Sequence, residues 1–291
     1  QGGEEARRIG GLIREKKLAS ERAVRNIVHA ACGNDPLKLT RLNHASRRTS
    51  SNVWTMNASA RDHTLMSPPV AARVLFYALL GGPTANGRAL DCGEKTVPSP
   101  IIGHDSLEQR MHLEICKMKG LSRHFACLAA ALAVARSVAP KALTTEQAID
   151  DFGAPCPASR ENRLRPGDLA CLKGPNFWLF ADLTVTLQKD EVLKERATGS
   201  KHCLVTERAK GKIGKYRDTF EKKTAAFLPL AFSAYGGSCQ LTNAGLRELA
   251  TAVEEQAQVG APLGSTPLWI RLRDAITVQV LAGPARWAIE L

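Results

Sequence analysis

The chain has 291 residues, of which 44% are hydrophobic, and carries 40 Lys and Arg against 28 Asp and Glu, a formal net charge of +12. The length and apolar content exclude a largely disordered chain and allow one large or two modest domains. The positive charge favours a polyanionic partner, because each neutralised phosphate releases counterions. The longest apolar runs, such as residues 125–135, exclude a membrane-spanning helix, which needs roughly 20 residues.

The first residue and the cysteines set two further expectations. The chain begins at Gln1 and opens without a charged-then-apolar leader, so we expect a piece of a longer protein that is not a secreted precursor. The eight cysteines lack paired spacing, which predicts reduced thiols and a nuclear or cytosolic setting. Five of them are expected to be buried or incidental thiols without a metal-binding role: Cys127, Cys156, Cys171, Cys203 and Cys239.

The amino-terminal half is predicted to be mainly helical. Residues 1–30 show basic, weakly amphipathic helical spacing, and residues 68–82 form a helical pattern begun by prolines and ended by glycines. Helical spacing resumes over residues 104–136, with an interruption at "KMKG", residues 117–120. A polar linker is expected at residues 137–164.

A hairpin is predicted in the stretch "RPGDLACLKGPNFWLFADLTVT", residues 165–186. Two β-rich runs flank a Gly-Pro-Asn turn, which predicts strands at 168–172 and 178–187. Strands normally exclude aspartate, yet each run contains one, Asp168 and Asp182. Hairpin pairing would bring the two carboxylates together, and a divalent cation between them would relieve their repulsion. The alternative is that Asp168 caps a turn and Asp182 faces solvent.

The remaining elements complete an α/β pattern. A lysine-rich helical segment at 189–224 precedes a third predicted strand at 226–234. Two helices are predicted after it, over 241–256 and 266–291. The order strand, strand, helix, strand, helix, helix predicts an α/β core in which the lysine-rich helix packs across a mixed sheet.

The order of several short motifs resembles a known family. "RPGD", a second aspartate after 13 intervening residues in "ADLTVT", "KIGKY" and "FLPLAFSAYGG" follow one another as in the carboxyl-terminal nuclease domain of non-LTR retrotransposon polyproteins. The segments 54–83 and 112–132 and the last helix agree in order, so the resemblance extends from about residue 49 to the end. It implies a restriction-endonuclease-like core of the PD-(D/E)XK superfamily, with a mixed sheet flanked by helices and preceded by a mainly helical, knuckle-like segment.

The resemblance also implies a chemistry. Nucleases of this family hydrolyse a phosphodiester with Mg²⁺ held by acidic side chains, which assigns both metal binding and catalysis to Asp168 and Asp182. The superfamily's usual lysine lies two residues after the second acid, where this chain has Thr184. Lys212 and Lys215 are therefore the candidate catalytic lysines, and their spacing of three places both on one helical face.

Other positions are assigned to nucleic acid or depart from the family pattern. Ser233 stands where many relatives carry an acidic residue, which leaves the metal affinity open. Arg165 is expected to contact DNA phosphate or brace the site, with an ordinary strand-edge charge as the alternative. His124 has helix capping or a surface position as its alternative. The predicted nucleic-acid contacts are Arg165, Tyr216, Arg123 and His124.

A zinc knuckle is only partly present. Relatives hold zinc with C-x2-C followed by H-x3-C, and this chain supplies Cys92, His112 and Cys116 but has Ala89 at the first cysteine position. Three ligands do not close a structural tetrahedral site. Either His104 serves as the fourth Zn²⁺ ligand, or the metal is lost and packing alone holds the segment.

The implied protein is a Mg²⁺-dependent endonuclease domain that nicks target DNA and leaves a 3′ hydroxyl for a reverse transcriptase located upstream in the full polyprotein. We expect DNA as the partner, with RNA as a second candidate, no membrane, and a nuclear location after a cytoplasmic stage. The implied domains are a helical linker at 1–83, a degenerate zinc knuckle and helix at 84–136, and an endonuclease-like domain at 137–291.

Two alternatives stay open. The departures at Ala89 and Ser233 also fit a catalytically inactive, retroelement-derived fragment that only binds nucleic acid. A basic host protein, such as an organelle ribosome component, could imitate the strand pair by chance.

Overall fold

The computed structural model describes residues 90–91, 96–97, 117–147, 167–186, 204–220, 225–234, 236–257 and 266–290, and the single positions 11, 15, 26 and 30. The four single positions are helical, and they lie in the segment 1–30 for which a helix is predicted. The helix predicted at 68–82 lies outside the described residues. So do Arg165 and the predicted zinc ligands Cys92, His104, His112 and Cys116.

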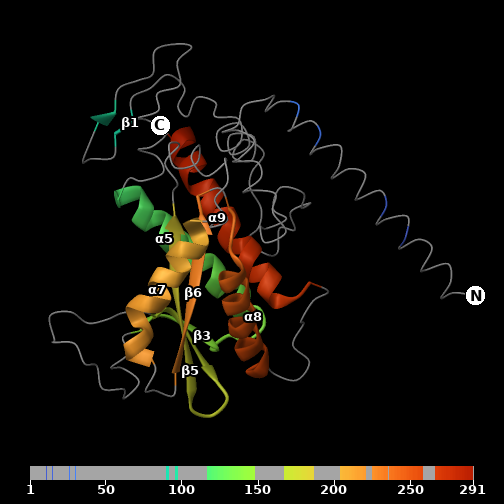
Figure 1. Ribbon diagram of the computed structural model, residues 1–291. Helices are drawn as coiled ribbons and strands as arrows, with labels where there is room; N and C mark the ends of the chain where they lie inside the picture. The colour runs from blue at the N-terminus through green and yellow to red at the C-terminus, as the bar shows by residue number, and fades with distance from the viewer. Residues whose placement is uncertain are drawn as a thin grey trace, which may run out of the picture.

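The central element is a four-stranded mixed sheet (Figure 1). Its strands are β3 (Leu143–Gln147), β4 (Gly167–Lys173), β5 (Phe177–Thr186) and β6 (Ala225–Ser233), in the order β3-β4-β5-β6. β4 pairs antiparallel with β3 and β5, whereas β5 pairs parallel with β6. Pro229, which cannot donate to a ladder, is tolerated because β6 is an edge strand. The predicted mixed sheet and its three predicted strands are confirmed. A separate two-residue pair, β1 (Leu90–Asp91) and β2 (Thr96–Val97), lies upstream.

β4 and β5 form the predicted hairpin. The paired residues run from Lys173 and Phe177 at the turn to Leu169 and Ala181. Gly174 has φ 62°, a left-handed backbone conformation that glycine adopts without steric cost. The turn therefore forms at the "KGPN" sequence that predicts it.

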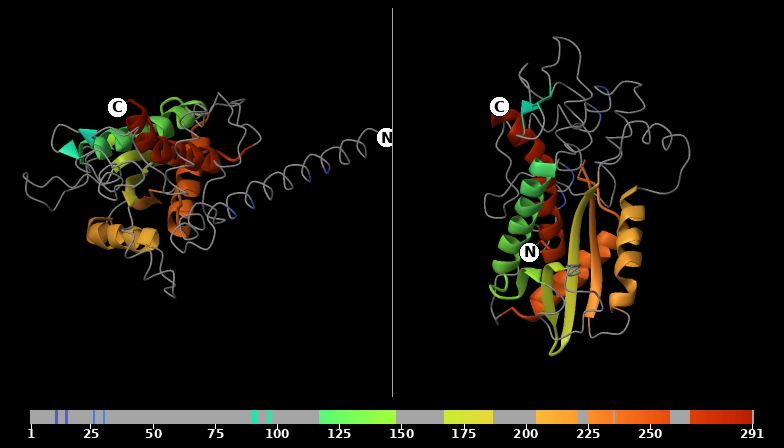
Figure 2. Two further views of the ribbon diagram at one scale, coloured as in Figure 1. Left: turned by 90° about the horizontal axis from the view of Figure 1, so that it is seen from above. Right: turned by 90° about the vertical axis from the view of Figure 1, so that its left-hand side faces the viewer.

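Helices cover both faces of the sheet. α5 (Lys117–Arg136) and α9 (Leu268–Glu290) lie together on one side, whereas α7 (Leu204–Phe220) lies on the other (Figure 2). α8 (Gln240–Glu255) packs with α5 and α9 in the same hydrophobic core. The predicted α/β class is confirmed, since a mixed sheet carries helices on its two faces.

Strand alternation assigns the side chains of β5 to two different cores. Leu179, Ala181 and Leu183 enter the large core formed with α5, α8 and α9. Phe180 points the other way and packs with Tyr216 of α7. Because side chains two residues apart share a face, the next side chain after Phe180 on the α7 face is that of residue 182.

The structure differs from the prediction in two places. β3 lies within the segment predicted as a polar linker, because four of its five residues are polar; Leu143 enters the core, whereas Thr144 is exposed. The interruption predicted at residues 117–120 is wrong, because α5 begins at Lys117 and runs unbroken to Arg136. Tertiary packing of the apolar residues farther along α5 outweighs the weak helix propensity of its glycine.

α5 belongs to the same core as the sheet. Cys127, Ala131 and Val134 of this helix are buried together with Leu169 of β4 and Ile276 of α9. The boundary predicted between residues 136 and 137 separates the helix from strands with which it shares this core. Among the residues that the structure describes, no helix has the length and apolarity needed to cross a bilayer.

Candidate active site

Asp182 is a buried acid on an inner strand. It lies in β5, where residues 179–183 are all buried, and only 6% of its surface is exposed. β5 is flanked by β4 and β6, so its backbone position is fixed on both sides. The flanking residues Ala181 and Leu183 face the large core, which leaves the Asp182 carboxylate on the α7 side.

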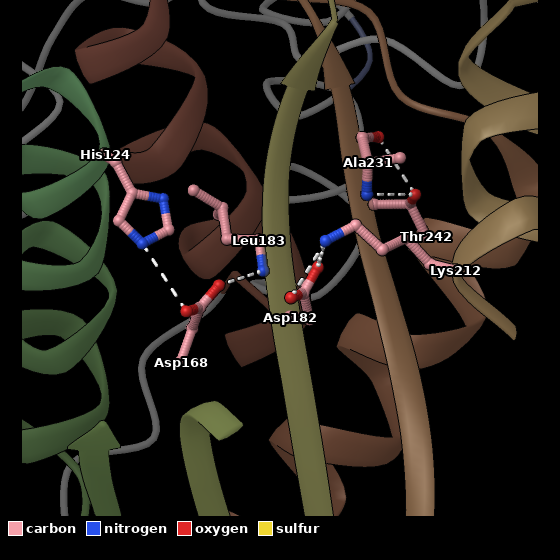
Figure 3. Close-up of polar contacts among 7 residues, drawn as sticks. All are labelled: His124, Asp168, Asp182, Leu183, Lys212, Ala231 and Thr242. Atoms are coloured by element: carbon pink, nitrogen blue, oxygen red, sulfur yellow. Dashed lines mark hydrogen bonds and ion pairs between the residues drawn. The ribbon is translucent and has the colours of Figure 1, made fainter. Parts of the chain in front are cut away.

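Lys212 of α7 is the partner of Asp182. Its Nζ donates a hydrogen bond to Oδ1 at 3.1 Å and lies 2.7 Å from Oδ2 (Figure 3). α7 is anchored on either side of this lysine, because Ala209 packs against Ala231 of β6 and Tyr216 packs against Phe227. The helix therefore holds Lys212 over β5 while 21% of its side chain stays exposed.

The electrostatic environment perturbs Asp182. Burial is the largest influence and raises the pKa of its carboxyl. The hydrogen bond and the charge of Lys212 lower this pKa, the charge of Asp168 raises it, and the charge of Lys215 lowers it. Perturbation by burial together with specific charged neighbours is typical of functional sites, although structural ion pairs also produce it.

Asp168 makes different contacts at the start of β4. Its Oδ2 accepts a hydrogen bond from the backbone N–H of Leu183 at 2.7 Å, and its Oδ1 lies 3.5 Å from Nε2 of His124 on α5. The paired residues of β4 and β5 end at Leu169 and Ala181, so the carboxylate takes a strand N–H just beyond the ladder. The predicted turn-capping alternative for Asp168 is replaced by this strand contact.

The two aspartates share a neighbourhood but have separate partners. Figure 3 shows the Asp168 carboxylate on the α5 side of β5, near His124, and the Asp182 carboxylate on the side of Lys212. Asp168 is nevertheless close enough for its charge to raise the pKa of Asp182. The structure brings Asp182 and Lys212 into direct contact, and it links Asp168 to Asp182 through the adjoining residue Leu183.

Lys215 and Tyr216 take different positions on α7. Lys215 is exposed, and its Nζ lies 4.9 Å from the centre of the Tyr216 ring. Tyr216 itself is buried at 4% exposure, with its ring 4.8 Å from that of Phe227. The predicted contact of Tyr216 with nucleic acid disagrees with this burial, since the ring packs between α7 and the sheet.

Arg123, His124 and Ser233 are also described. Arg123 and His124 are half-buried on α5, where His124 faces Asp168 and Arg123 lies close enough to Cys127 to lower the pKa of that thiol, against the larger effect of burial. Ser233 is the buried last residue of β6, and its Oγ accepts a hydrogen bond from the N–H of Gly237 in the turn that follows, at 2.9 Å. A serine at this position therefore stabilises a turn.

The donor chemistry of Asp182 fits a hard divalent cation. Its buried Oδ2 lies 2.7 Å from Nζ of Lys212 and has no further hydrogen-bond partner among the residues that the structure describes. A cation would also offset the burial that raises its pKa. Both oxygens of Asp168 also have partners, because they face His124 and the Leu183 amide. The described ranges contain no group of three or more His, Cys, Asp or Glu that could hold a metal ion.

One supporting residue carries no clear sequence signal. Thr242 of α8 uses its Oγ1 both to accept a hydrogen bond from the N–H of Ala231 and to donate one to the Ala231 carbonyl, each at 3.0 Å (Figure 3). It thereby satisfies a backbone position on the edge strand β6, beside the strand that carries Asp182. A threonine near a helix start is common, so its sequence position alone does not predict this contact.

The chain was compared with known proteins in three ways. No family model, no curated protein and no solved structure matches it.

Proposed function

We propose that this chain contains a Mg²⁺-dependent endonuclease domain that nicks target DNA to prime reverse transcription. The observation that carries the proposal is the buried Asp182 of β5 in direct contact with Lys212 of α7. Replacing a buried ion pair by well-packed apolar residues is often neutral or stabilising, so fold stability alone is a weak reason for the Asp182–Lys212 pair. The restriction-endonuclease-like core implied by the motif order agrees with a mixed sheet flanked by helices.

The residues of the site have distinct proposed roles. Asp182, together with Asp168, would hold Mg²⁺ through carboxylate oxygens. The bound ion supplies an activated water and neutralises developing charge on the phosphate. Lys212 lowers the pKa of Asp182 and so favours its ionised form, and, being partly exposed, it can also donate to a phosphate oxygen that enters from solvent.

Three residues around Asp182 support the proposed site. Lys215 adds a positive charge that favours the ionised form of Asp182. Asp168 fixes the backbone of β5 at Leu183, immediately after Asp182. His124 in turn faces the other oxygen of Asp168.

A second candidate is an inactive, retroelement-derived fragment that binds nucleic acid. The observation that favours it is the separation of the two carboxylates, since Asp168 faces His124 and Asp182 faces Lys212. In this reading the aspartates only stabilise the sheet, and the positive charge of the chain is used for binding.

Incubation of the chain with supercoiled plasmid distinguishes the two candidates. Nicked circles that form with Mg²⁺ and not with EDTA support the nuclease. A chain that retards the plasmid on a gel and leaves it supercoiled with Mg²⁺ supports the inactive binding fragment. A chain that does neither contradicts both.

A further inference from the structure

The outer surface of α7 is strongly basic. Arg208, Lys210, Lys215 and Arg217 are all exposed on it. Glu207, in the first turn, is the acidic residue on the part of this surface whose side chains the structure describes. We define the exposed surface of α7 from residue 207 to residue 217 as the α7 face.

The cations of the α7 face form two rows. Arg208 and Lys215 are seven residues apart, as are Lys210 and Arg217, so each pair lies along one side of the helix. At about 100° per residue the two rows stand roughly 160° apart around the exposed surface. Like charges repeated along one helix destabilise it, so the sequence keeps these rows at some cost in stability.

One row leads to the buried acid. Lys212 lies four residues after Arg208 and three before Lys215, so it belongs to the same side of the helix. Its Nζ contacts Asp182. The row therefore connects the solvent-exposed surface with the site in which Asp182 is buried.

The strip between the rows is nearly bare. Gly211 and Gly214 are exposed there, and a Cβ added to either would meet no atom of the described part of the chain within 4 Å. Glycine inside a helix is unfavourable relative to alanine, and no residue that the structure describes packs closely enough to require it at these positions. The two glycines leave space for another backbone between the cationic side chains.

We infer that the α7 face binds the phosphate backbone of duplex DNA and guides one strand toward Asp182. The inference rests on the proposed function for the choice of DNA and for the direction of the strand. Its physical support is the charge complementarity between two rows of cations and a polyanion, and the continuity of one row with Lys212.

Binding measurements test the charge of the α7 face. Affinity of the whole chain for a labelled duplex is measured without Mg²⁺ over a range of salt concentrations, for the parent, for R208Q/K210Q and for the control R136Q/K141Q. The control also removes one exposed arginine and one exposed lysine, at the end of α5 and in the turn after it. Loss of two phosphate contacts should lower the salt slope of R208Q/K210Q by about 1.8 and weaken low-salt binding roughly tenfold or more. The control should behave like the parent.

Larger side chains in place of Gly211 and Gly214 give an independent test. G211L/G214L keeps the net charge and favours the helix, but places two side chains between the rows. Its affinity should fall while its salt slope stays near that of the parent. The control A129L adds a similar side chain at an exposed position of α5 and should bind normally.

The outcomes separate this inference from the proposed function. Parental binding by R208Q/K210Q, equal losses in both charge variants, or unchanged affinity of G211L/G214L would overturn the inference even if the parent nicks plasmid. Losses confined to single-stranded RNA, with duplex binding unchanged, would overturn the choice of partner. If the variants lose affinity as expected but the parent does not nick plasmid, the result would support DNA binding by the α7 face and contradict the nuclease.

Discussion

The Asp168 carboxylate accepts a hydrogen bond from the backbone amide of Leu183, the residue that follows Asp182. The β4–β5 ladder has its last paired residues at Leu169 and Ala181, so this carboxylate extends the connection between the strands beyond the backbone pairing. This hydrogen bond gives a structural explanation for an aspartate at this position of β4. It also couples the position of Asp168 to the backbone at Asp182.

Replacing Asp168 should loosen β5 next to Asp182. We expect Asp168→Ala to speed hydrogen exchange at the Leu183 amide and to lower the free energy of unfolding by about 1–3 kcal/mol, because a buried N–H loses a charged acceptor. Asp168→Asn retains an acceptor oxygen and should show a smaller effect in both measurements. Equal protection of the Leu183 amide in all three proteins would contradict this role.

The two candidate lysines should not be equivalent. Lys212 contacts Asp182 directly, whereas Lys215 is exposed and acts on Asp182 through its charge. At saturating DNA we expect Lys212→Ala to slow nicking about 10²–10³-fold, the range for loss of one preorganised donor. Lys215→Ala should have a smaller effect, and the double variant the largest. Lys141→Ala, at an exposed position after α5, is the control. A greater loss from Lys215→Ala than from Lys212→Ala would contradict the assignment.

Much of the sheet could be predicted from the sequence. The aromatic and β-branched runs around "KGPN" encode β4 and β5, and the lysine-rich segment before the third run encodes α7. β3 could not be predicted, since a strand with four polar residues out of five lacks apolar alternation in its sequence and depends on pairing with β4.

The site was predictable in its residue types more than in its contacts. Asp182 stands out in the sequence because it interrupts an apolar strand, and Lys212 stands out because it belongs to "KIGKY". The contact of Asp168 with His124 could not be predicted, because it depends on where α5 packs. Tyr216 lies among lysines in the sequence, which hides its role in the core. Its burial follows from the helical period, because it lies on the side opposite the exposed glycines.

Asp182 should destabilise the fold as pH rises. Its pKa in the folded state is raised above the usual value of 3.8, so between these two values the folded state binds more protons than the unfolded state. Stability from this group is therefore present at low pH and lost as pH rises through the folded-state pKa. Asp182→Asn should be more stable than the parent in urea at pH 7, and the difference should shrink toward pH 4. A variant less stable than the parent at pH 7 would mean that the Lys212 contact outweighs the cost of burial.

The turn after β6 should tolerate no side chain at Gly236. Gly236 has φ 77°, and a Cβ there would lie 2.7 Å from Cγ2 of Thr277. Gly174 also has a positive φ, of 62°, but a Cβ there would meet no described residue within 4 Å. Gly174→Ala should cost about 1–2 kcal/mol of conformational strain, and Gly236→Ala should cost clearly more because a clash is added. Equal losses in urea unfolding would show that α9 moves freely away from the turn.

The most direct test of the central claim is the nicking rate of Asp182→Asn on supercoiled plasmid with Mg²⁺, measured beside the parent and beside binding of the same protein to duplex DNA. We predict that the parent nicks the plasmid, and that the variant loses nicking while its affinity for the duplex stays equal or rises slightly, because a negative charge has been removed near the phosphate. A variant that nicks as fast as the parent would contradict the account, because the activity would then belong to another site.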